Sequence, residues 1–66
     1  MKIAISEKLK AYRAQHNLTQ QELGELLNVS PQAISKWERC ACYPDITLLP
    51  DLAQLLSCTV NDFFVV

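Results

Sequence analysis

Apolar residues recur three and four positions apart along the chain, and no segment alternates apolar and polar residues as a half-buried strand does. This spacing predicts an all-helical protein. The first helix is expected to begin near Ser6, whose hydroxyl can cap it, with Ile5, Leu9 and Tyr12 along one face. Asn17 is expected to end this helix, because asparagine tolerates the left-handed conformation found at many helix ends.

The next two helices each begin with a capping residue. Thr19 is followed three positions later by Glu22, which is the spacing of a capping box. The apolar stripe of this second helix consists of Leu23, Leu26 and Leu27. Ser30 caps the third helix, and Pro31 takes the first helical position, where no backbone N–H is needed.

A proline inside an apolar pattern sets the start of the fourth helix. The pattern consists of Ile46, Leu49, Leu52, Leu55 and Leu56. Proline is tolerated in the first turn of a helix, so Thr47 as the cap would place Pro50 at the third helical position. A last short helix is expected over residues 60–64, capped by Thr59 with Asp62 three residues on.

Residues 20–39 combine two short helices with a tight turn. Gly24 stands where two steeply crossing helices need a small residue, and Asn28 suits a turn position with positive φ. The inner angle is packed by Leu23, Leu27, Val29, Ile34 and Trp37. The other side of the third helix carries polar residues with few acids. This is the pattern of a helix-turn-helix, whose second helix enters the major groove of DNA.

Composition limits the protein to one small domain, residues 1–66. The formal net charge is −1 and half of the residues are apolar, which excludes a disordered tail and leaves too little chain for a large catalytic cleft. No apolar run approaches the roughly 18 residues of a membrane span, and no secretion signal is evident. We therefore expect a cytoplasmic protein. Because there is no basic excess, nucleic-acid binding is indicated by local pattern alone.

The cysteines leave three interpretations open. The chain has Cys40, Cys42 and Cys58, and an odd number of cysteines without a secretion signal indicates a reducing compartment. With His16 they could supply four metal ligands, but one residue between paired cysteines is shorter than usual zinc spacing. We expect no metal and no cofactor. Small, partly buried free thiols are preferred over a metal site or a redox sensor.

A longer stretch of sequence resembles a known family. Residues 18–39 read LTQQELGELLNVSPQAISKWER, followed by PDI at 44–46, LAQLL at 52–56 and TVNDFF at 59–64. This resembles the XRE family of Cro and phage-repressor-type helix-turn-helix proteins. The resemblance implies a compact five-helix domain with the motif at about residues 19–39. It also implies double-stranded DNA binding as a homodimer on a palindromic operator and transcriptional regulation, with repression the preferred role, in a bacterium or phage.

The resemblance assigns site residues one by one. Base edges would be read by Gln32, Ala33 and Lys36, with Ser35 on the flank of the same helix. Phosphates would be contacted by Gln20 and Arg39, while Ser30 is first a cap whose hydroxyl could also bind a phosphate. Arg13 and Glu38 would form a structural ion pair. Where the family often has glycine, this chain has Asn28 and Cys40. The alternative for Gln32 and Lys36 is an ordinary solvated helix face.

The sequence is compatible with functions other than DNA binding. The near-neutral charge permits a protein-interaction module, such as an antitoxin or adaptor subunit using the same helices. A thiol- or metal-responsive switch would use the three cysteines. An enzyme is not expected, because no nucleophile, base and acid occur together and no glycine-rich phosphate loop is present. No small-molecule substrate is indicated. At the end of the chain, Phe63 and Phe64 are expected to complete the core and to contribute to a dimer interface.

Overall fold

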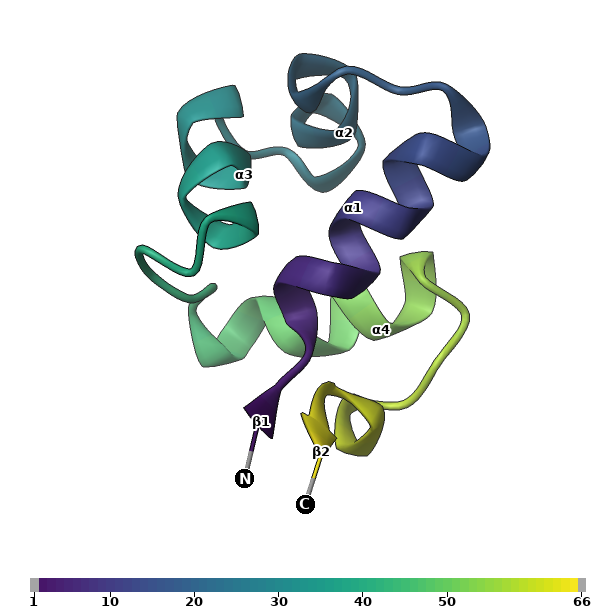
Figure 1. Cartoon of the computed structure of the whole chain (residues 1–66), viewed down its shortest axis with the longest axis vertical. Helices are drawn as coiled ribbons and strands as arrows, with labels where there is room; N and C mark the ends of the chain where they lie inside the picture. The colour runs from purple at the N-terminus through teal and green to yellow at the C-terminus, as the bar shows by residue number, and fades with distance from the viewer. Residues whose placement is uncertain (1, 66) are drawn as a thin grey trace.

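The computed structural model describes residues 2–65, and it is helical apart from one pair of very short strands (Figure 1). In chain order the elements are β1 (Lys2–Ile3), α1 (Ile5–His16), α2 (Gln20–Leu27), α3 (Pro31–Glu38), the 3-10 helix η1 (Ile46–Leu48), α4 (Leu49–Leu55), the 3-10 helix η2 (Val60–Phe63) and β2 (Phe64–Val65). The expected all-helical architecture is confirmed in this coarse form.

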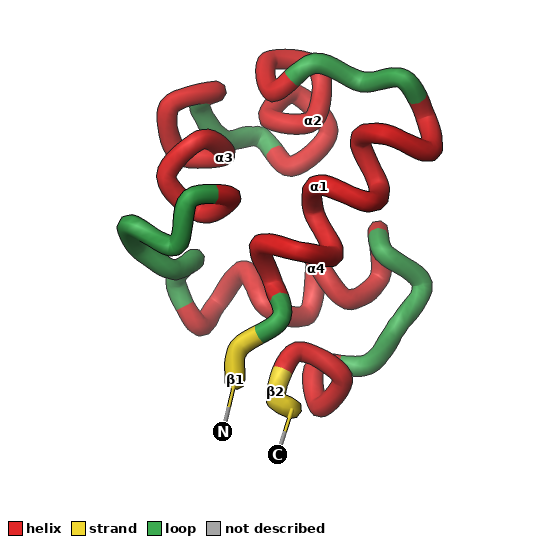
Figure 2. Tube along the Cα trace, viewed as in Figure 1, coloured by secondary structure: helices red, strands yellow, loops and turns green. Residues whose placement is uncertain are grey.

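Helix α1 crosses the middle of the molecule, with α2 and α3 on one side of it and α4 on the other (Figures 1 and 2). The strands pair in antiparallel register, Lys2 opposite Val65 and Ile3 opposite Phe64. This pairing joins the two ends of the described chain. The side chains that lie completely inside come from all four α-helices and η2, and they are Leu9, Leu23, Ile34, Leu52 and Phe63.

Several predicted helix ends are confirmed, and all of them depend on residues close together in sequence. The Thr19 hydroxyl accepts from the Glu22 N–H at 3.0 Å, and the Glu22 carboxylate accepts from the Thr19 N–H at 2.9 Å, which completes the capping box. The Ser30 hydroxyl caps α3 by accepting from the Ala33 N–H, with Pro31 at the first helical position. Asn17 has φ 54°, the expected left-handed conformation.

The prediction that Ser6 caps the first helix is wrong. Helix α1 begins at Ile5, two residues earlier than a cap at Ser6 implies, and its N-cap Ala4 donates a backbone hydrogen bond to the Phe63 carbonyl at 2.7 Å. Ser6 lies inside the helix and is buried, and its hydroxyl accepts a hydrogen bond from the Cys40 thiol at 3.3 Å. The hydroxyl that was expected to cap the helix is thus bonded to a residue 34 positions away in the sequence.

The prediction of Thr47 as the cap of the fourth helix is also wrong. The Asp45 carboxylate accepts from both the backbone N–H and the hydroxyl of Thr47, each at 3.0 Å, and so caps η1 instead. Helix α4 continues from this 3-10 turn. Pro50 still falls in the first turn of α4, as expected. Ile46, which was expected on the apolar face, is 77% exposed because it belongs to the preceding turn.

The fifth α-helix expected over residues 60–64 is a 3-10 helix that ends at Phe63. Phe64 has extended backbone because it pairs with Ile3, so the helix stops after four residues. The short strands themselves had not been expected. The two phenylalanines also differ, since Phe63 is fully buried whereas Phe64 is 36% exposed. The structure thus has four α-helices in its described part rather than five.

Candidate nucleic-acid interface

A tight turn between α2 and α3 fixes how the two helices cross. Asn28 has φ 61°, the left-handed conformation expected of it, and the N–H of Val29 returns to the Gly24 carbonyl at 2.8 Å. A Cβ atom on Gly24 would lie only 2.6 Å from the Val29 carbonyl oxygen. The close approach of backbone to backbone predicted at Gly24 is therefore present. It holds α3 at a set angle against α2.

Helix α3 is anchored on one side and open on the other. Ile34 is fully buried and Trp37 is 6% exposed, so the inner face is locked in the core. Gln32 and Lys36 are exposed on the opposite side, one helical turn apart. Neither side chain has a hydrogen-bond partner within the described chain, and both are available to a ligand. Ala33, expected at a base edge, is half-buried and packs against the core.

The remaining predicted contact residues surround this face. Ser30 is exposed, and its hydroxyl accepts from the Ala33 N–H at 3.1 Å. Arg39 is exposed just past α3 and donates to the Ser35 hydroxyl at 3.3 Å. Ser35 is half-buried and serves as this acceptor.

Gln20 belongs to a hydrogen-bonded network behind the face. The Glu38 carboxylate accepts from Arg13 through Nε at 2.6 Å and Nη2 at 2.7 Å, and from Gln20 Nε2 at 3.2 Å. Arg13 also donates to the Leu18 carbonyl at 3.1 Å. The pair expected to be structural thus ties α1 to α3, and it also contacts the start of α2, a link that sequence reasoning missed.

The pKa values of this pair reflect both burial and hydrogen bonding. Burial of the Glu38 carboxyl favours its neutral form, but the hydrogen bonds from Arg13 and Gln20 and the nearby positive charge outweigh burial. The pKa of Glu38 therefore lies below its ordinary value. The hydrogen bond to Glu38 raises the pKa of Arg13 in turn. The pair is a stable ion pair, and its two charges cancel close to the open face of α3.

A shallow hollow of about 290 Å³ lies where α2 and α3 begin, lined by Gln20, Pro31, Gln32 and Ser35. Three of these four residues were expected to contact DNA. The hollow thus gathers side chains from two helices at one place on the surface. Amide and hydroxyl groups of this kind can donate to phosphate oxygens and to base edges.

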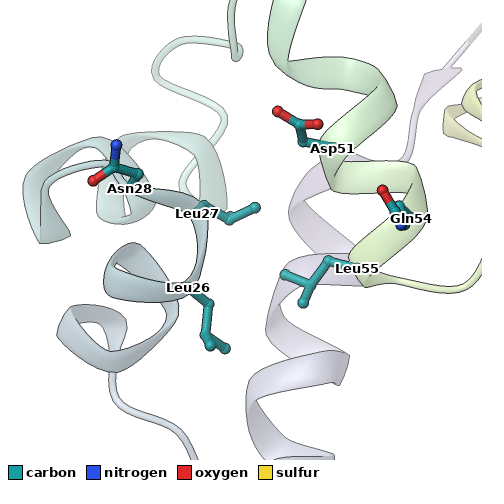
Figure 3. A pocket seen from close by; sticks show the side chains of 6 residues that line it. All are labelled: Leu26, Leu27, Asn28, Asp51, Gln54 and Leu55. Carbon is teal, nitrogen blue, oxygen red and sulfur yellow. The ribbon is translucent and has the colours of Figure 1, made fainter.

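A second, more apolar hollow of about 400 Å³ separates α2 from α4 (Figure 3). Leu27 and Leu55 point toward one another across it, and Asp51 lies at one end on α4 (Figure 3). Leu26 was expected in the apolar stripe of α2, but it is 57% exposed at this hollow, which corrects that prediction. Its neighbours Leu23 and Leu27 face the core, which leaves Leu26 at the edge of the stripe.

The cysteines are all free thiols. Cys40 has φ 59°, the conformation for which the resembling family often uses glycine, and it is exposed together with Cys42. Cys58 is half-buried against the core. Among residues 2–65, no three His, Cys, Asp or Glu side chains come together as a metal site requires. None of the helices described is long and apolar enough to cross a membrane.

Two short helices joined by a tight turn, with the second helix anchored inside and polar outside, define a protein of the helix-turn-helix class. The family model described as helix-turn-helix matches residues 9–63, and the chain belongs to this family, in its XRE form.

Named relatives fit this assignment. The chain is 42% identical over 57 residues to the HTH-type transcriptional activator BcrR of Enterococcus faecalis, covering 86% of this chain but only 28% of that protein. It is 38% identical over 61 residues to an uncharacterized HTH-type transcriptional regulator, MJ0272, of Methanocaldococcus jannaschii, covering 92% of each. The solved structure of the P22 c2 repressor in complex with a synthetic operator matches with a TM-score of 0.78 and 32% identity over 91% of each chain.

Proposed function

We propose that this protein binds double-stranded DNA in a sequence-specific manner and regulates transcription. The observation that carries the proposal is the pair Gln32 and Lys36, exposed one turn apart on a helix whose other side is locked in the core by Ile34 and Trp37. Such a helix can enter a major groove without losing its position in the fold. The P22 c2 repressor, to which the chain is similar, was solved in complex with a synthetic operator.

Each side chain has a chemical role in this proposal. Gln32 pairs with adenine through its amide, and Lys36 donates to guanine O6 and N7. Ala33 offers its methyl group to a thymine, and Ser35 lies on the flank of these contacts. Phosphate contacts are made by Gln20, Ser30 and Arg39, which frame the α3 face. Phosphate contacts position the protein, while Gln32 and Lys36 select the sequence.

Residues 1–66 act in this proposal as one DNA-binding domain, which forms a homodimer on a palindromic operator and acts in the cytoplasm as a repressor, not as an enzyme. Two copies would place their α3 helices in major grooves about 34 Å apart. Support for dimerisation comes from charge. With a formal net charge of −1, a single copy has little general attraction to DNA, and a second α3 face supplies additional contacts.

Selection of bound sequences from a pool of random duplexes tests the proposal. The wild type is expected to enrich a palindromic consensus, and a Gln32→Ala, Lys36→Ala double variant is expected to lose it. Gln54→Ala is the matched control, because Gln54 is an exposed glutamine on α4, outside the α3 face. Failure of the wild type to enrich any sequence would refute DNA reading, and an enriched site without symmetry would refute the dimer.

Protein binding is a second candidate function, favoured by the hollow between α2 and α4. Its apolar wall includes the exposed Leu26, and the two helices carry Glu22, Glu25 and Asp51 with no Lys, Arg or His. A leucine-lined hollow with the carboxylate of Asp51 at one end, between helices that carry no cation, fits a partner segment that presents leucines beside lysines or arginines. A partner at this hollow would leave the α3 face free.

The two candidate functions respond to different substitutions. Leu26→Ser is expected to abolish binding of a synthetic amphipathic helix rich in Leu and Lys, and to leave binding to the selected duplex unchanged. Gln21→Ser is the control, because Gln21 is exposed on the same helix but does not line the hollow. Equal binding of the peptide by both variants would remove the second candidate.

A further inference from the structure

The amide of Gln20 has a defined orientation in the protein. A carboxylate accepts hydrogen bonds but cannot donate them, so the NH₂ group of Gln20 must face Glu38, at 3.2 Å from Oε1. Gln20 is the first residue of α2, and Glu38 is the last residue of α3. One contact thus joins the two ends of the helix-turn-helix. Gln21, the next residue, is exposed and has no side-chain hydrogen bond within residues 2–65.

Glu38 can hold this position beside a DNA face only because its charge is neutralised. Arg13 binds both of its carboxylate oxygens, and the Glu38 side chain is 5% exposed. A bare carboxylate there would repel a nearby phosphate. Arg13 is itself fixed by its hydrogen bond to the Leu18 carbonyl. The acceptor that orients Gln20 is therefore both rigid and electrically balanced.

The second N–H of the Gln20 amide remains available. Gln20 is half-buried and lines the hollow shared with Pro31, Gln32 and Ser35. We propose that Glu38, held by Arg13, is a positioning residue for DNA binding, which turns the Gln20 amide so that its second N–H donates to a phosphate at this hollow. This inference rests on the proposed function. It gives the Arg13–Glu38 pair a role in recognition in addition to its role in the fold.

A double-mutant cycle tests the coupling. Dissociation constants are measured by fluorescence anisotropy on the duplex enriched in the selection, for the wild type, Gln20→Ala, Glu38→Gln and the double variant. In the wild-type background, Gln20→Ala is expected to weaken binding about tenfold, the loss of one hydrogen bond to a charged group. In the Glu38→Gln background the same change is expected to weaken binding less than about twofold.

The chemistry of the substitution explains the difference. A glutamine at position 38 has one carbonyl oxygen, which Arg13 takes, and its NH₂ group then faces Gln20 and favours the reversed amide. The affinity of Glu38→Gln alone is not the readout, because the charge of Arg13 is no longer neutralised in this variant and increases the general attraction to DNA. Gln21→Ala is the matched control and is expected to have the same small effect in both backgrounds.

The outcomes separate the two proposals. If the wild type binds its duplex and Gln20→Ala weakens binding equally in both backgrounds, the positioning role is wrong and the proposed function stands. If the wild type binds no duplex, both fall. Circular dichroism verifies that each variant is folded at the assay temperature. If Glu38→Gln is unfolded there, ¹⁵N relaxation of wild-type side-chain amides decides instead. Gln20 should be rigid and Gln21 mobile, and equal mobility would overturn the inference.

Discussion

Gly24 offers a direct test of how the helix crossing is built. A Cβ atom at this position would lie 2.6 Å from the Val29 carbonyl oxygen, closer than real Cβ contacts allow, and the atom it meets is backbone rather than a flexible side chain. Val29 cannot withdraw easily, because its N–H is bonded to the Gly24 carbonyl at 2.8 Å and Asn28 holds the turn at φ 61°. A larger residue must therefore push α3 away from α2.

The magnitude follows from two opposing terms. Replacing glycine by alanine inside a helix gains up to about 1 kcal/mol of helix propensity, while over-packing a close contact costs about 1–3 kcal/mol. Gly24→Ala is therefore expected to lower the free energy of unfolding by no more than about 2 kcal/mol. Valine has two methyl groups more than alanine and a lower helix propensity, so Gly24→Val is expected to lower the free energy of unfolding by about 3 kcal/mol or more.

Urea unfolding followed by circular dichroism measures both variants, and thermal melts should show falls of about 4–8 °C for each kcal/mol lost. Gln21→Ala provides the control for propensity alone, because Gln21 is exposed on the same helix. The wild type or the Gly24→Ala variant should be the most stable, and the Gly24→Val variant the least stable. A valine variant as stable as the alanine variant would refute the close backbone approach.

Three further predictions concern the cap, the ion pair and the binding face. Ser30→Ala removes the acceptor for the Ala33 N–H and should cost about 1 kcal/mol of unfolding free energy, measured by urea titration. The pKa of Glu38 is lowered in the folded protein, so the stability that it contributes is present above its unfolded-state value and is lost as the pH falls through the folded-state value. Urea midpoints measured between pH 7 and pH 3 should therefore fall once the pH drops below about 4.5. The Glu38→Gln variant should show a smaller fall, and an equal fall in both proteins would contradict a paired Glu38 carboxylate. Lys36→Ala should relax preference at one base pair by about 1–3 kcal/mol, whereas Arg39→Ala should weaken binding to all duplexes and reduce the salt slope by about 1; identical behaviour of the two variants would contradict their separate roles.

What could be predicted from the sequence depends on how far apart the interacting residues lie. The capping box of Thr19 and Glu22, the Ser30 cap and the left-handed Asn17 and Asn28 all involve neighbours along the chain, and all are confirmed. Local chemistry alone determines these features, because a cap needs only its own helix.

The predictions that failed involve partners distant in sequence or a closer competitor. The sequence predicts Ser6 as a cap, but its hydroxyl accepts a hydrogen bond from Cys40, 34 residues away. The last helix was expected to reach Phe64, but pairing with Ile3 at the other end of the chain makes that residue extended. Neither partner is visible in the spacing of apolar residues. Thr47 shows the competing case, since the nearby carboxylate of Asp45 accepts from it.

The candidate site divides in the same way. Helical spacing predicts that Gln32 and Lys36 lie on the side of α3 opposite Ile34 and Trp37. In the structure Ile34 and Trp37 are buried, and Gln32 and Lys36 are exposed as expected. The contact between Gln20 and Glu38 joins two helices across 18 positions, and it depends on the packing of α2 against α3 rather than on neighbours in the sequence. The exposed face of α3 can therefore be predicted from the sequence more readily than the contacts that hold the neighbouring helices in place.

The charge of the protein decides what kind of DNA binding this geometry can support. Six Lys and Arg residues stand against seven Asp and Glu residues, and the Arg13–Glu38 pair beside the α3 face is neutral. On and just past α3 the cations are Lys36, which is proposed to contact a base, and Arg39, which is proposed to contact a phosphate. Each neutralised phosphate contributes about −0.9 to the salt slope. Under the proposed function, we therefore expect affinity at physiological salt to come from base contacts and from a second copy. Two copies on one duplex would give a protein titration curve steeper than that of a single site. They would also give a salt slope about twice the slope expected from the phosphate contacts of one α3 face.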